Sequence, residues 1–157
     1  LRLVDEAWMC GLIVVCAAGN KGPGAMTISP IGARKNVITV GCNEGGYFGE
    51  RENLCESYSS RGPSPFDVKK PDIVAPGTDI MSCNAFFEKR GFRFKNAYVK
   101  KSGTSMATPI VAGGMALLLQ KYPFYSNEQA KKKVIKTAKD LKEPWNKQGA
   151  GMIQITS

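Results

Sequence analysis

The stretch Gly103-Thr-Ser-Met-Ala-Thr-Pro109, which runs directly into Ile110-Val-Ala-Gly-Gly-Met-Ala-Leu-Leu-Leu119, decides the fold of this 157-residue chain. A serine between small residues at the start of an apolar helix has little steric cover. The helix start also supplies unpaired backbone N–H groups and the positive end of the dipole, which favour negative charge beside Ser105. Pro109 fits this placement because proline is tolerated in the first turn of a helix. The alternative is that Thr104 or Ser105 only caps a buried helix.

Gly103 to Pro109 resembles the nucleophile motif of the subtilisin-like serine proteases, the subtilase or peptidase S8 family, in which the serine attacks the scissile carbonyl. Val14-Val-Cys-Ala-Ala-Gly-Asn20 is similar to the strand that ends in the family's oxyanion-hole asparagine. The other stretches that resemble family segments are Asn36–Gly41, Ser57–Pro63 and Lys70–Gly77. Because their order and spacing also fit, the resemblance covers nearly the whole chain.

The resemblance implies roles for several residues in the cleavage of a protein or peptide substrate. Ser105 is the expected nucleophile, and its backbone N–H and the Asn20 amide are the expected donors to the oxyanion. Ala17, Ala18 and Gly19, together with residues 29–32, are expected to line the pocket for the side chain before the cleaved bond. The opposite wall of that pocket is expected upstream of this chain.

The chain contains no histidine, so the base that such a serine needs is missing from it. Subtilases carry their catalytic Asp and His upstream of the oxyanion asparagine. We therefore expect residues 1–157 to be the C-terminal portion of a single catalytic domain, inactive on its own. Lys100 and Lys101 are poor substitutes for the base, because exposed lysines in a basic stretch stay protonated. Many subtilases have histidine where Ile110 stands, which bears on the subfamily and not on the chemistry.

Two other functions are compatible with parts of this pattern. A catalytically inactive subtilase relative, serving as a scaffold or regulator, would keep the fold after losing its Asp or His. An unrelated α/β module that binds a phosphorylated ligand is disfavoured, because neither G-x-G-x-x-G nor G-x-x-x-x-G-K-[ST] occurs. Intact Ser105 and Asn20 favour the protease over the inactive relative.

The order of apolar runs predicts an α/β protein. Buried strands are expected at residues 12–16, 37–40 and 72–75, and helices at residues 1–10, from the Ser105 motif to about 122, and from a capping box at 126 to about 141. A hairpin is expected at residues 86–94 and a closing strand within residues 149–155. This is the C-terminal part of a three-layer subtilisin-like fold with a mainly parallel sheet.

Charge is unevenly distributed along the chain, whose formal net charge is +9. Residues 1–83 hold eight basic and nine acidic side chains, whereas residues 84–157 hold fourteen basic and four acidic ones. The lysines of residues 131–142 alternate with apolar positions at helical spacing, which indicates a solvated helix face. No nucleic-acid partner is expected, since no aromatic-interleaved basic motif accompanies them. No segment is apolar for long enough to predict a membrane span.

The five cysteines are odd in number and lack metal-ligand spacing, which predicts free thiols and favours a reducing or anaerobic setting. No cofactor is assigned. By resemblance, Asp72 and the carbonyls of residues 30–33 neighbour a calcium site in some relatives, whereas the residues themselves favour a strand-capping role for Asp72. Finally, a parallel sheet cut before residue 1 would expose an edge strand, so the isolated chain is expected to self-associate.

Overall fold

The computed structural model describes residues 1–64 and 68–155, and its centre is a three-stranded parallel sheet. The strands are β1 (Val15–Ala17), β2 (Ile38–Cys42) and β3 (Ile73–Ala75), in the order β1-β2-β3. Val15 pairs with Ile38, and Val40 pairs with Ile73. Every residue of β2 and β3 is buried, as expected for short apolar strands covered on both faces. The predicted α/β class with a mainly parallel sheet is confirmed.

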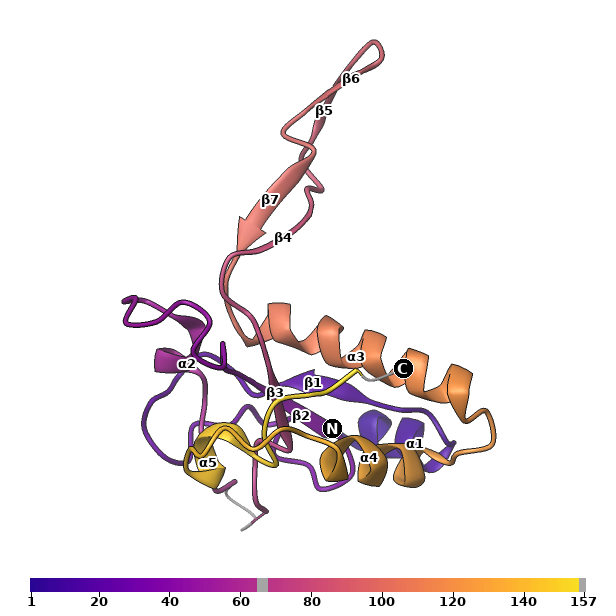
Figure 1. The fold of residues 1–157 in the computed structure, drawn as a ribbon. Coiled ribbons are helices and arrows are strands. Elements are labelled where there is room, and N and C mark those ends of the chain that lie inside the picture. The colour runs from indigo at the N-terminus through magenta and orange to yellow at the C-terminus, as the bar shows by residue number, and fades with distance from the viewer. Residues whose placement is uncertain (65–67, 156–157) are drawn as a thin grey trace.

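The helices are arranged around this sheet, and three of them pack with it in the main hydrophobic core (Figure 1). They are α1 (Arg2–Met9), α3 (Thr104–Lys121) and α4 (Asn127–Lys136), with two single-turn helices, α2 (Cys55–Tyr58) and α5 (Trp145–Gln148). The long helix α3 packs against all three strands, and α4 packs beside α3. Side chains from α1, α3, α4 and strands β2 and β3 meet in one cluster, which includes Trp8, Ile38, Val40, Ile73, Val111, Met115 and Val134. This packing fixes the start of α3 relative to the ends of the strands.

A long β-hairpin projects from the body beside the first turn of α3 (Figure 1). Its base pairs β4 (Ile80–Cys83) with β7 (Tyr98–Lys101), and its tip pairs β5 (Glu88–Arg90) with β6 (Arg93–Lys95), both antiparallel. The hairpin predicted over residues 86–94 is confirmed, and the structure extends it to residues 80–101. We call these residues the hairpin arm.

The structure corrects four of the predictions. The buried strand expected at residues 12–16 is instead β1 at Val15–Ala17, which is only half-buried. The basic helix α4 ends at Lys136 and not near residue 141, because Lys139 instead exchanges two backbone hydrogen bonds with Met152. Residues 149–155 make only isolated bridges through Met152 and form no closing strand. Pro109 is the sixth residue of α3 and lies inside the helix, beyond its first turn. Lacking an N–H, it cannot donate to the carbonyl of Ser105 one turn earlier.

The predicted capping box of α4 is confirmed. The Ser126 hydroxyl accepts a hydrogen bond from the Gln129 N–H, and the Gln129 side chain accepts one from the Ser126 N–H. Gly11, which follows α1, has a φ of +87°, the left-handed conformation expected after a helix. All five cysteines are free thiols. Over residues 1–64 and 68–155, none of the helices is both long and apolar enough to cross a membrane.

Two lysine ammonium groups share the carboxylate of Asp72 at the start of β3. The Lys70 ammonium lies 2.6 Å from Asp72 Oδ2 and donates to the carbonyl of Val37, and its side chain is fully buried. The Lys131 ammonium lies 3.2 Å from Asp72 Oδ1 and also donates to Val37. Asp72 Oδ2 further accepts a hydrogen bond from the N–H of Thr39 in β2. Burial lowers the pKa of Lys70, and the Asp72 charge opposes that shift.

Replacing Asp72 with asparagine in the complete protein should lower the free energy of unfolding by about 3 kcal/mol, because it leaves the buried Lys70 ammonium without its counter-charge. Urea denaturation followed by circular dichroism measures this change. The matched control is Asp140→Asn, which removes an ion pair of 2.9 Å to Lys142 at an exposed position. Equal effects of the two substitutions would show that Asp72 has no special structural role.

Candidate active site

Ser105 lies at the start of α3 with its side chain exposed to solvent. The core face of this helix is formed by Ala107, Val111 and Met115, which recur every four residues. Ser105 precedes Ala107 by two residues and so lies about 200° around the helix axis from it. Its hydroxyl has no hydrogen-bond partner in the part of the chain that the structure describes. The predicted presentation of this serine at a helix N-terminus is confirmed.

Gly103 allows the chain to enter the helix close to Asn20. Its φ of +142° is a conformation that residues with a side chain rarely adopt. A Cβ at this position would lie 3.1 Å from Asn20 Nδ2. The Gly103 N–H donates to the carbonyl of Gly77, 2.9 Å away, which ties the helix start to the turn after β3.

The Asn20 amide is held in one orientation by Thr104. Asn20 Oδ1 accepts hydrogen bonds from the Thr104 N–H at 3.1 Å and from the Thr104 hydroxyl at 3.0 Å. Because the backbone N–H is only a donor, the amide oxygen must face Thr104 and the NH₂ group must point elsewhere. Thr104 is fully buried, and its hydroxyl also accepts a hydrogen bond from the Gly19 N–H at 3.2 Å.

Two donors remain unused at the start of α3. Neither Asn20 Nδ2 nor the Ser105 N–H has an acceptor among residues 1–64 and 68–155. The free backbone donor follows from its place in the first turn of a helix, where N–H groups have no intrahelical partner. An oxygen that becomes negative on an acyl group attacked by Ser105 would find both donors nearby.

The segment Ala17 to Gly19 leads from β1 to Asn20. Ala18 is fully buried against Ile28 and Ala33, whereas Ala17 and Gly19 are half-buried. The Ser29 hydroxyl donates to the Ala17 carbonyl at 2.9 Å, and the Ser29 N–H donates to the Ala18 carbonyl at 2.7 Å. The segment is thus fixed to Ser29, and residues 17–19 and 29–32 are the two stretches that the resemblance associates with one pocket.

Glu44 supports the loop behind the serine, a role that the sequence did not indicate. Its buried carboxylate accepts hydrogen bonds from the N–H groups of Gly77 at 3.0 Å and Thr78 at 2.9 Å. The Cys42 thiol lies 3.2 Å from the same oxygen. A hydrogen bond with the Cys55 thiol and burial both raise the pKa of Cys42, so this thiol stays protonated and donates to Glu44. Glu44 therefore holds the turn whose carbonyl receives the Gly103 N–H.

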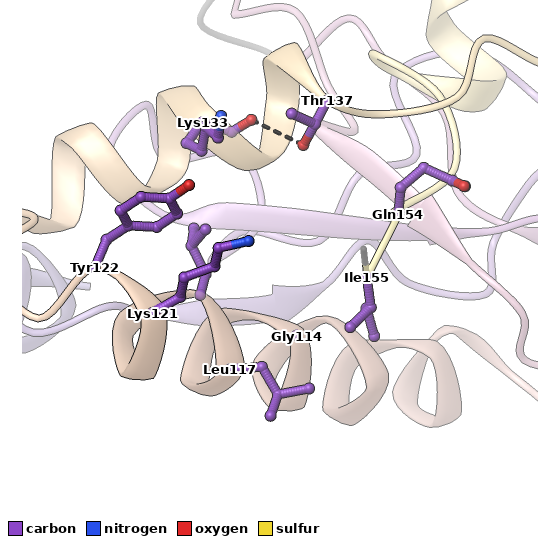
Figure 2. A pocket seen from close by; sticks show the side chains of 9 residues that line it. Gly114, Leu117, Lys121, Tyr122, Lys133, Thr137, Gln154 and Ile155 are labelled. Atoms are coloured by element: carbon purple, nitrogen blue, oxygen red, sulfur yellow. Dashed lines mark hydrogen bonds between the residues drawn. The ribbon is translucent and has the colours of Figure 1, made fainter. Parts of the chain in front are cut away.

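Two cavities of the surface lie at different distances from Ser105. A cavity of about 450 Å³ lies between the arm and the start of α3 and includes Ser105 and Met106 in its lining. A larger one, of about 610 Å³, lies between α3 and α4, with Lys121, Tyr122 and Thr137 around it (Figure 2). Its α3 residues begin at Gly114, about 14 Å along the helix from Ser105. Only the smaller of these two cavities adjoins the serine.

Comparison with known proteins agrees with this geometry. The sequence profile described as the subtilase family, Peptidase_S8, matches residues 3–152. Serine protease AprX from Bacillus subtilis (strain 168) is 40% identical over 161 residues, which cover 98% of this chain and 36% of that protein. Subtilisin DY from Bacillus licheniformis is 33% identical over 156 residues, which cover 98% of this chain and 49% of that protein.

A solved structure shows the same fold. Sphericase superimposes with a TM-score of 0.76 at 28% sequence identity, over 99% of this chain and 52% of that one. The chain thus spans between about a third and a half of the length of the proteins it matches. Its architecture corresponds to the subtilisin-like α/β fold over that part.

Proposed function

Because this chain belongs to the subtilase family of serine proteases, we propose that its complete protein is a serine endopeptidase and that this chain supplies the nucleophile and the oxyanion hole. The observation that carries the proposal is the pair of unused donors at the start of α3, where the Ser105 hydroxyl is exposed. Asn20 Nδ2 is aimed by Thr104, and the Ser105 N–H is left free by the helix start.

In the proposed reaction, Ser105 Oγ attacks the carbonyl carbon of a peptide bond and loses its proton to a base. The carbonyl oxygen becomes negative and accepts hydrogen bonds from Asn20 Nδ2 and the Ser105 N–H. The C–N bond then breaks, and the base returns its proton to the leaving amine, which leaves the acyl group as an ester on Ser105. Water, which loses a proton to the same base, then attacks this ester, and the C–O bond to Ser105 breaks, so that the acid is released and the serine recovers its proton. Both oxyanion donors are fixed before the substrate binds, so they stabilise the developing charge without rearrangement.

We propose that the base and its orienting carboxylate, a His and an Asp, are contributed by a segment upstream of this chain. The chain itself has no histidine. Lys100 and Lys101 are exposed at the base of the arm, where an ammonium is well hydrated and unsuited to accept the serine proton. An Asp and a His encoded upstream of this chain would support the assignment.

Substrate contacts are proposed at the segment that precedes Asn20. The backbones of Ala17 and Gly19 would line the pocket for the side chain before the cleaved bond, together with residues 29–32. Ala18 would support this wall of the pocket from its buried side, since its side chain is fully buried. No cofactor is assigned to the reaction, because each proposed step uses only side-chain and backbone groups.

Assaying the isolated chain shows whether it can hydrolyse a peptide without a base from the upstream segment. We expect it to hydrolyse a fluorogenic peptide no faster than background, because Ser105 lacks a base. We also expect it to self-associate in light scattering, since β1 is at the edge of the described sheet and its residues are only half-buried. A clean monomer would contradict the edge argument. Hydrolysis that depends on Ser105 would contradict the upstream base.

A further inference from the structure

The hairpin arm is a charged and aromatic surface beside Ser105 that the proposed reaction does not use. It carries six basic side chains and one acidic one: Lys89, Arg90, Arg93, Lys95, Lys100, Lys101 and Glu88. It also exposes five aromatic side chains: Phe86, Phe87, Phe92, Phe94 and Tyr98. Phe86 is 88% exposed and Phe92 fully so. A patch of this kind on a soluble surface marks an interaction site.

The pairing of the strands gathers Arg90, Arg93 and Lys95 on one face of the tip, together with Glu88, and leaves Lys89 on the other face. Arg90 lies directly across from Arg93, and Lys89 lies across from Phe94. Because side chains alternate along a strand, these two pairs lie on opposite faces. Glu88 is engaged by Arg90 at 3.0 Å, and like charges opposite each other destabilise a ribbon. A negatively charged partner would relieve this repulsion.

The position of the arm points to the partner. The cavity at its base is lined by β4, β7 and the first turns of α3, with Ser105 among its residues. A peptide chain cleaved at Ser105 would therefore pass the base of the arm. Both outer edges of the β4–β7 ribbon are open among the described strands, so an extended chain can add along it.

We propose that the hairpin arm binds an acidic segment of the substrate protein, separated from the cleaved bond by several residues. The proposal rests on the protease function proposed above and adds the substrate class. Ten residues separate Ile80 at the base from Arg90 at the tip, and because residues 84–87 between β4 and β5 are not strand, the distance is at most about 33 Å, the length of a fully extended chain. An extended substrate covers that distance in about ten residues, so the acidic segment should lie roughly five to ten residues from the cleaved bond.

The first test measures binding without catalysis. The complete protein with Ser105→Ala is titrated against a fluorescein-labelled peptide that carries four glutamates eight residues from a neutral cleavage sequence, and anisotropy is recorded. The arm variant replaces four residues by glutamine: Lys89, Arg90, Arg93 and Lys95. It should bind the peptide about tenfold more weakly. Salt at about 1 M, where the Debye length is about 3 Å, should weaken binding to the unsubstituted arm by the same factor. The matched control substitutes four exposed lysines, Lys132, Lys136, Lys139 and Lys142, by glutamine and should bind as before.

The second test measures selectivity in the active protein. The ratio of kcat/KM for the acidic peptide to that for a glutamine version should be about tenfold, should fall to about one in the arm variant and should persist in the lysine control. Placing the glutamates on each side of the cleaved bond in turn shows on which side of that bond the arm binds the substrate.

Equal binding of both peptides, or binding unaffected by the arm variant, would overturn the proposal. So would arm-dependent binding of vesicles containing one third phosphatidylserine without selectivity between the peptides. Failure to hydrolyse either peptide would refute the protease function, and the anisotropy result would still decide the arm.

Discussion

Replacing Ser105 with alanine in the complete protein should lower kcat for a peptide substrate by about 10⁶-fold, the effect of removing a triad nucleophile in a subtilisin. The size follows from the loss of the covalent step. Peptide hydrolysis over several orders of magnitude of enzyme concentration measures it. KM should change little, because the serine hydroxyl adds little to ground-state binding.

Ser102 provides the matched control for this substitution. It lies three residues before Ser105, is also exposed, and accepts a hydrogen bond from the Asp79 N–H at 2.9 Å. Ser102→Ala also removes one exposed hydroxyl group, from the loop just before α3, and should leave kcat within a few-fold of the wild type. A large loss with Ser102→Ala and a small one with Ser105→Ala would place the nucleophile elsewhere.

Replacing Asn20 with alanine should lower kcat by about 10²–10³-fold and change KM little, because the Nδ2 hydrogen bond strengthens as the oxygen becomes negative. Stopped-assay kinetics at several substrate concentrations separate the two parameters.

Asn20→Asp distinguishes donation to the substrate from support of the loop. An aspartate keeps an oxygen that can accept from the Thr104 N–H and hydroxyl but offers no NH₂ group, so it should be as impaired as alanine. A loss that appears mainly in KM, or an active aspartate variant, would reject the oxyanion role of Asn20.

Local sequence predicted the elements whose formation depends on neighbouring residues. The capping box at Ser126 and the apolar runs of β2 and β3 appear where propensity and periodicity placed them. The predicted end of α4 was wrong because the observed end depends on Met152, which lies later in the chain and forms a β-bridge with Lys139. The interior position of Pro109 was missed because a motif locates a serine without stating where the helix begins.

In the candidate site, too, the sequence predicted what depends on local motifs and missed what depends on partners distant along the chain. Ser105 and Asn20 were identified from their motifs, but the group that orients the amide, Thr104, is 84 residues from Asn20. Thr104 was considered only as a helix cap, and its contact with Asn20 is created by the tertiary fold. The sequence did not indicate a role for Glu44, because a glutamate after a strand is expected at the surface. Only the structure shows that its carboxylate accepts hydrogen bonds from the N–H groups of Gly77 and Thr78. The charge of the arm was noticeable in the sequence, whereas its position beside Ser105 was not.

The most direct test of the central claim, that Ser105 is the nucleophile of a serine protease, is the site of covalent modification in the complete protein. It is incubated with a serine-directed peptidyl phosphonate, digested, and examined by tandem mass spectrometry. The account predicts one phosphonyl adduct, on Ser105, formed in parallel with loss of peptide hydrolysis. An adduct on another residue, or inhibition of an active enzyme with Ser105 unmodified, would contradict it.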